Sequence, residues 1–89
     1  MNKTSVVAGE FIHNRGRIHP HVFRDGWALT NWETALVLEV SERTVAAYCA
    51  SPGATSKRSP SASVERLTYE QHQAWLRQGR LPKHPEIFR

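Results

Sequence analysis

Apolar side chains recur at helical spacing in the middle of the chain, between two stretches that are mostly polar. The apolar positions of the first such segment are Trp32, Ala35, Leu36 and Leu38. This spacing predicts an amphipathic helix whose apolar side is formed by these four residues. Thr30 and Glu33 form a T-x-x-E capping box, so we expect the helix to begin just after Thr30.

A second, shorter helix is predicted directly after the first one. Glu39 and Val40 form the connecting turn, and Ser41 is a good N-cap because its hydroxyl can accept an amide N–H of the first turn. An apolar stripe at helical spacing follows, formed by Val45, Tyr48 and Cys49. Pro52 then ends the helical pattern, with Gly53 just beyond.

The two predicted helices and their turn resemble the helix-turn-helix unit of small bacterial and phage DNA-binding regulators. The matching positions are a small residue in the first helix, an apolar residue in the turn, a polar cap and two inward apolar residues: Ala35, Val40, Ser41, Val45 and Tyr48. Glu39 departs from the pattern, because the family usually has glycine in the turn. The resemblance covers about a quarter of the chain and identifies no subfamily.

The resemblance implies that the second helix, residues 41–50, reads base edges in the major groove of DNA. The residues expected to contact bases are Ser41, Glu42, Arg43, Thr44 and Ala47. Arg43 is the strongest candidate, since a bidentate contact with guanine contributes ~1–3 kcal/mol of discrimination. Two alternatives stay open: Arg43 pairs with a neighbouring glutamate, and Glu42 only stabilises the N-terminus of its helix.

The segments on either side of this unit are predicted with less regular structure. Residues 1–26 form an N-terminal arm or a β-hairpin, with a turn at residues 24–26. Residues 51–63 contain five serines and two prolines, and they form a flexible loop or the tip of a wing. Residues 64–82 form a short strand and then a helix that is capped by Thr68 and ended by Gly79. Residues 83–89 form an apolar tail that docks on a partner or on the domain itself.

Charge is distributed unevenly along the chain, whose net charge is +4. Residues 1–29 carry a net charge of +2, residues 30–50 carry −2, and residues 51–89 carry +4. The predicted reading unit is therefore acidic, and contacts with DNA phosphates must come mainly from its flanks. The candidates for phosphate contact are Arg15, Arg17, Lys57, Arg58 and Arg66.

Several classes of function have little support in the sequence. We find no nucleophile–base pair, carboxylate pair or glycine-rich phosphate loop, so we do not expect an enzyme. The spacing of His13, His19 and His21 does not favour a metal site, and the single cysteine excludes an intramolecular disulfide. No apolar run is long enough to cross a membrane, and we expect a cytoplasmic protein without a cofactor.

These observations predict one mainly α domain with a helix-turn-helix and a third helix, with a short β-hairpin or wing as a possible addition. The expected function is sequence-specific binding of double-stranded DNA by a small transcriptional regulator or a phage or mobile-element accessory factor. A homodimer would suit paired half-sites. Two other hypotheses are a protein–protein adaptor that keeps the fold without binding DNA, and a binder of single-stranded nucleic acid or RNA.

Overall fold

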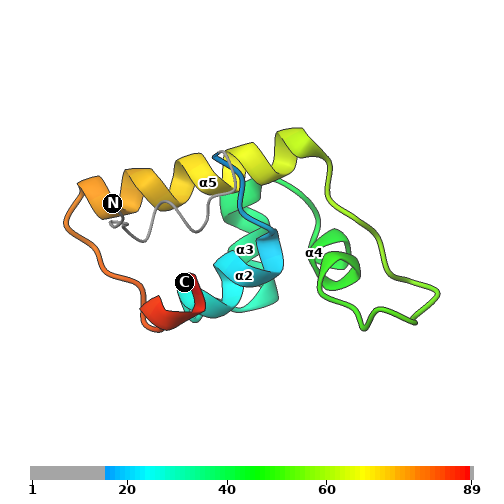
Figure 1. Ribbon diagram of the computed structural model, residues 1–89. Helices are drawn as coiled ribbons and strands as arrows, with labels where there is room; N and C mark the ends of the chain where they lie inside the picture. Colours follow the sequence, from blue (N-terminus) through cyan, green and yellow to red (C-terminus); the bar gives the residue numbers. More distant parts are fainter. Residues whose placement is uncertain (1–15, 89) are drawn as a thin grey trace.

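The computed structural model describes residues 16–88 and consists of four α-helices and a final 3-10 turn. The elements are α2 (Pro20–Gly26), α3 (Asn31–Leu38), α4 (Glu42–Tyr48), α5 (Ala62–Arg77) and η1 (Pro85–Phe88). The prediction of a mainly α fold is confirmed. The long helix α5 runs along one side of the molecule, and α2, α3 and α4 lie together on the other side (Figure 1).

The expected β-structure is not found in residues 16–88. The predicted strand at residues 64–67 lies inside α5, which begins at Ala62, well before the predicted cap at Thr68. Ser61 is the actual N-cap, and its Oγ accepts the Val64 N–H at 3.2 Å. Thr68 is buried within the helix instead, where its hydroxyl donates to the Val64 carbonyl at 2.7 Å. Residues 6–15 of the alternative hairpin lie outside the described part of the chain.

Helix α2 occupies the place where a turn was predicted. His19 is extended, as its position before a proline requires, and its Nδ1 accepts the His21 N–H at 3.0 Å. Pro20 then occupies the first helical position, where its fixed φ angle suits a helix and its missing N–H costs nothing. The turn signal at residues 24–26 marks the end of this helix rather than an isolated turn.

Helices α2 and α5 end in the same hydrogen-bond pattern, which requires a left-handed residue. At the end of α5, Gly79 has φ +86°, and the Arg80 N–H donates to the Trp75 carbonyl at 3.0 Å. This is the C-cap predicted at Gly79. At the end of α2 the left-handed residue is Ala28, with φ +57°, although a side chain at this conformation is strained.

The core is built mainly from aromatic rings contributed by α2, α5 and η1. The buried residues of this cluster are Ile18, Phe23, Trp27, Trp75 and Phe88. The ring centroids of Trp27 and Trp75 are 4.9 Å apart in an edge-to-face arrangement, and those of Phe23 and Trp75 are 5.3 Å apart. Such contacts add to the free energy gained from burial of the rings.

His72 lies inside this aromatic cluster and is fully buried. Its Nδ1 accepts a hydrogen bond from Trp27 Nε1 at 2.9 Å, so the ring proton belongs on Nε2, which has no partner within the described residues. Burial lowers the pKa of His72 from 6.5 to about 4.

The predicted docking of the C-terminal tail on the domain itself is confirmed. Phe88 is buried, and its ring stacks on His72 with centroids 4.4 Å apart. Gly26 provides the space for Phe88, because a Cβ atom at this position would collide with the phenyl ring. The His84 N–H also donates to the Gly26 carbonyl at 2.9 Å, which attaches the segment before η1 to the end of α2.

Helix α3 buries only part of the apolar side that the sequence predicts: Ala35 and Leu38 are buried as expected, whereas Trp32 and Leu36 are not. Its buried residues are Thr34, Ala35 and Leu38. Trp32 and Leu36, which were assigned to the core, are 58% and 59% exposed. They are four residues apart and therefore lie together on one outward side of the helix.

Replacing Ala28 by glycine should stabilise the protein by about 0.5–1 kcal/mol. Ala28 is exposed, so the substitution loses little packing while it removes the strain of a left-handed alanine. The free energy of unfolding, measured with urea and tryptophan fluorescence, tests this. The matched control is Ala46→Gly, since Ala46 is exposed inside a helix and glycine there should be destabilising. Equal effects of the two substitutions would contradict the explanation.

Stability should depend on pH through His72. Its native pKa of about 4 lies below the ordinary 6.5, so between these values the unfolded chain binds a proton that the native protein does not bind. The contribution of neutral His72 to the free energy of unfolding is therefore complete above pH 6.5 and is lost as the pH falls to about 4. In His72→Asn, which keeps an acceptor for Trp27, urea midpoints should fall less over this interval than in the unmodified protein. Parallel pH profiles would refute the assignment.

Candidate nucleic-acid interface

Helices α3 and α4 begin where the sequence predicts. Thr30 Oγ1 accepts the Glu33 N–H at 3.0 Å, and Glu33 Oε1 accepts the Thr30 N–H at 2.8 Å, which completes the predicted capping box. Ser41 Oγ accepts the Thr44 N–H at 3.0 Å. Both caps satisfy amide groups that have no partner inside the helix.

A left-handed residue joins these two helices in a tight turn. Glu39 has φ +59° and ψ +43°, the conformation that glycine adopts most easily. The Val40 N–H donates to the Ala35 carbonyl at 3.1 Å, which closes the end of α3 and directs the chain into α4. The glutamate is held in a conformation that is strained for any residue with a Cβ atom.

Helix α4 is anchored on one side and exposed on the other. Val45 and Tyr48 are buried, as predicted for the inward residues. Ser41, Glu42 and Arg43 are exposed at the start of the helix, and Ala46 is exposed one turn later. Thr44 is half-buried, and its hydroxyl lies 2.8 Å from the Ser41 hydroxyl.

Ala47 does not belong to the exposed face of α4. Only 9% of its surface is accessible, and its carbonyl accepts the Arg58 N–H at 3.1 Å. The loop after α4 therefore covers the residue that was expected to contact a base. Ala46 is exposed instead. Both alanines lie equally far around the helix from the Val45 and Tyr48 stripe, so periodicity does not distinguish them.

Among residues 16–88, the Arg43 side chain has no ion-pair partner. Within residues 16–88, no carboxylate lies within ion-pair distance of its guanidinium. The alternative in which Arg43 pairs with Glu39 or Glu42 is therefore not found. An exposed guanidinium in the first turn keeps all its donors available for an external acceptor.

The loop between α4 and α5 is fixed to the end of α4 rather than extended as a wing of strands. Lys57 Nζ donates to the Tyr48 carbonyl at 2.8 Å, and the Lys57 side chain is partly covered. This ammonium caps the C-terminus of α4, where a positive charge is favourable. Arg58 is exposed, so the two cations of the loop have different environments.

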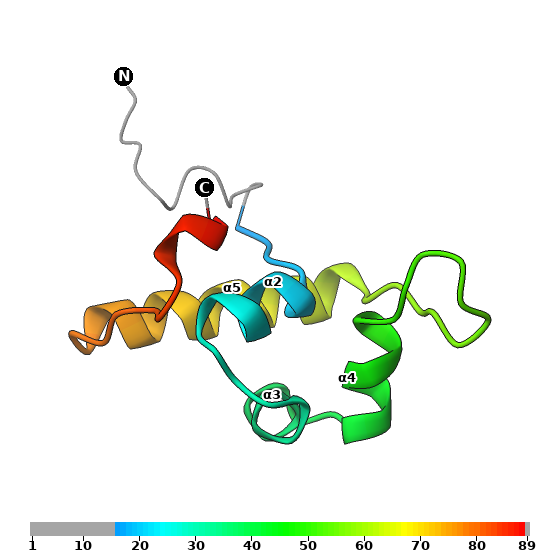
Figure 2. The same cartoon turned by 90° about the horizontal axis from the view of Figure 1, so that it is seen from below.

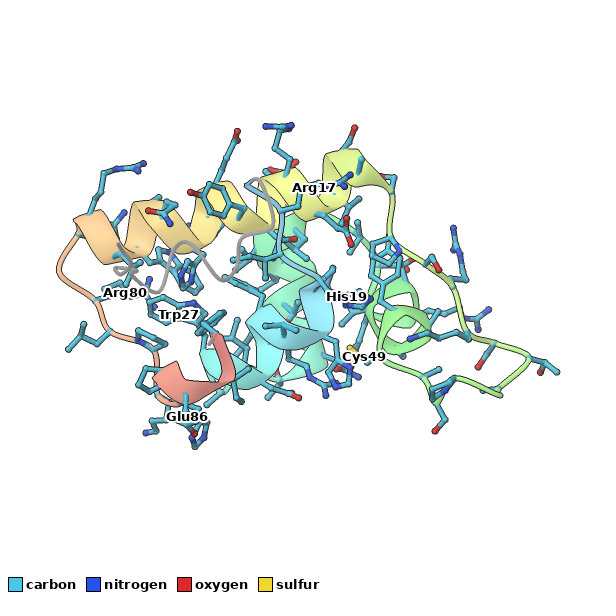
Figure 3. All side chains as sticks on the ribbon, in the orientation of Figure 1. Arg17, His19, Trp27, Cys49, Arg80 and Glu86 are labelled. Atoms are coloured by element: carbon cyan, nitrogen blue, oxygen red, sulfur yellow. The ribbon has the colours of Figure 1, made fainter. Side chains whose placement is uncertain are left out.

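Of the remaining candidates for phosphate contact, Arg17 and Arg66 lie at the N-terminal half of α5. Arg17 Nε lies 3.9 Å from Glu65 Oε1, a long and exposed contact that contributes little stability. Arg66 is exposed on α5 itself. Arg17 lies beside the ribbon of α5 in Figure 3, and Arg15 lies outside the described residues.

Two further titratable groups lie near the loop and α4. Burial lowers the pKa of His19, with a further contribution from Lys57, and this keeps the imidazole neutral for its role as a cap. Burial also raises the pKa of the Cys49 thiol, which disfavours the reactive thiolate. His19 and Cys49 lie on facing segments of the molecule in Figure 3.

Neither a metal-binding cluster nor a membrane-spanning helix is present in the described part of the chain. No group of three or more histidine, cysteine, aspartate or glutamate side chains among residues 16–88 is arranged to hold a metal ion. None of the helices in this range combines the length and the apolar character needed to cross a bilayer.

No family model, curated protein or solved structure matches this chain. The resemblance to helix-turn-helix regulators therefore rests on the residues of this segment alone.

Replacing Lys57 by methionine should destabilise the protein by about 1 kcal/mol, because the Tyr48 carbonyl loses a charged donor while the apolar stem of the side chain is kept. The matched control is Arg58→Met, which removes an exposed cation from the next position and should change stability much less. Urea unfolding of both variants measures the difference. Equal destabilisation would show that the Lys57 hydrogen bond has no stabilising role.

Proposed function

We propose that this protein binds double-stranded DNA and reads its sequence through the exposed first turn of α4. The supporting observation is the orientation of this helix. Val45 and Tyr48 fix one side in the core, while Ser41, Glu42 and Arg43 extend from the other side. A helix held in this way can enter a major groove, which is wide enough to admit it.

Arg43 is the residue that would discriminate between bases. Its guanidinium is exposed and unpaired within residues 16–88, so little has to be broken before it contacts a guanine. The small side chain of Ala46 on the same face allows close approach of the helix to the base edges. Glu42 and Ser41 flank Arg43 and would contact neighbouring positions.

Contacts with the phosphates would come from the flanks of α4. Arg58 and Arg66 are exposed, and neither has an ion-pair partner in the described chain. Lys57 is less suited to this role, because its ammonium already donates to the Tyr48 carbonyl. A duplex-binding role as a small transcriptional regulator or recombination accessory factor fits this arrangement, and the choice between them depends on the target sequence.

Arg43→Ala should reduce the preference for a selected duplex over random duplex by about 5- to 100-fold, which corresponds to the loss of one bidentate base contact. The target is first selected from a random duplex library, and affinities are then measured by fluorescence anisotropy across a salt series. Arg66→Ala is the matched control: it should weaken binding to both duplexes alike and lower the salt slope by about 1.

The same titrations distinguish the competing hypotheses. Duplex affinity that is negligible even in low salt would reject the proposal and favour the adaptor. A preference for single strands over duplex would favour the hypothesis that the protein binds single-stranded nucleic acid or RNA. If Arg43→Ala leaves the preference for the selected duplex over random duplex unchanged, α4 does not read the base sequence, even if the protein binds duplex.

A further inference from the structure

Two exposed apolar sites of opposite charge lie on different parts of the molecule. The first, called the α3 patch, consists of Trp32 and Leu36 with the exposed carboxylates of Glu33 and Glu39. The second, called the Leu81 end, consists of Leu81 with the exposed cations of Arg77 and Lys83. Neither site is used by the proposed contact between α4 and DNA.

The α3 patch has the composition of a protein-binding surface rather than of a solvated helix face. Trp32 and Leu36 expose more than half of their surface and lie one turn apart. Glu33 is held beside them by the capping box, so its carboxylate is already ordered. No cation lies within ion-pair distance of Glu33 or Glu39 among residues 16–88.

The Leu81 end has the complementary chemistry. Leu81 is 81% exposed and does not cover the end of α5. Arg80 occupies that place instead, with its guanidinium 3.9 Å from the centroid of the Trp75 ring and 5.7 Å from that of Trp27. Figure 3 shows Arg80 and Trp27 close together at this end of the molecule, so Leu81 is turned out to solvent.

The two sites cannot satisfy each other within one molecule. The connection after α5 lies at one extremity of the domain, while α3 lies beneath the middle of α5, and Figures 1 and 2 show them apart from both directions. A surface with exposed apolar residues and an acidic rim is best covered by an apolar side chain with flanking cations. A second copy of this chain offers that combination at its Leu81 end.

We propose that copies of this protein associate head to tail, with the Leu81 end of one copy seated on the α3 patch of the next. Leu81 contacts Trp32 and Leu36, while Arg77 and Lys83 face Glu33 and Glu39. Such a contact joins two different surfaces, so it leaves one free site at each end and can continue to further copies. The inference does not depend on DNA binding, since it uses no residue of the α4 reading face.

The association should be weak and dependent on protein concentration, because each site contains few apolar side chains. Sedimentation velocity of the full chain, at several concentrations in low and high salt, measures it. We expect the average mass to rise with concentration, and more steeply in low salt because the charged contacts are exposed. A monomer at every concentration would overturn the proposal.

Substitutions on either site should weaken association by about tenfold or more, as expected when a central apolar contact is lost. The two variants are Trp32→Gln with Leu36→Gln on the α3 patch, and Leu81→Gln at the other site. The matched control is Leu67→Gln, since Leu67 is 39% exposed on α5 but belongs to neither site. An equal effect of the control would show that association is non-specific.

Mixing the two variants distinguishes a head-to-tail contact from a two-fold one. The variant with an altered α3 patch keeps its Leu81 end, and the Leu81→Gln variant keeps its α3 patch. A mixture should therefore form a one-to-one complex that does not grow further, although neither variant associates alone. Retention of a dimer by Leu81→Gln alone would instead indicate two α3 patches in contact, and a mixture that stays monomeric would also reject the proposal.

Discussion

The buried contact between the indole of Trp27 and the imidazole of His72 joins the segments on which the rest of the fold depends. Trp27 ends α2 and donates its indole N–H to His72 on α5, and it packs edge to face on Trp75 one turn further along that helix. Phe88 closes the cluster from the C-terminal side by stacking on His72. Three segments that are distant in the sequence are thereby held together in a chain with few aliphatic residues.

This arrangement also determines which side of α3 is covered. Helix α3 packs against its neighbours through the buried Thr34, Ala35 and Leu38, and Val37 packs against the aromatic cluster. Small side chains and one leucine suit the close approach of helices, and Trp32 lies outside this contact. The exposed position of Trp32 thus follows from the packing of its neighbours and not from its own hydrophobicity.

Features whose partners lie within a few residues could be predicted from the sequence. The capping box at Thr30, the cap at Ser41 and the left-handed Gly79 depend on hydrogen bonds inside a single turn. The start of α5 was misplaced because Thr68 and Gln71 repeat a capping pattern inside the helix, and the real cap at Ser61 lies in a stretch rich in serine.

Features that depend on contacts between distant segments could not be predicted from periodicity. Apolar spacing identified α3 as a helix but not the side that α5 and α2 would cover. The sequence presents Lys57 and Arg58 as two equivalent adjacent cations. Nothing in it indicates that the Lys57 ammonium donates to the Tyr48 carbonyl while Arg58 stays in solvent. The burial of Ala47, whose carbonyl accepts the Arg58 N–H of the same loop, could not be predicted either, because it also depends on a contact with this loop.

The acidic character of the α3–α4 unit has a structural explanation that also constrains the proposed reading of DNA. Glu33 and Glu42 lie in the first turns of their helices, where a negative charge is favoured by about 0.3–1 kcal/mol at an exposed site. If α4 docks on DNA as proposed, the Glu42 carboxylate beside Arg43 would be repelled by phosphates and would need a donor. A cytosine amino group could supply it, whereas a guanine or thymine edge presents only acceptors and would leave the carboxylate unpaired. Glu42 would then exclude wrong bases while Arg43 selects the right one, so a carboxylate in the first turn of α4 would lower overall affinity but sharpen discrimination.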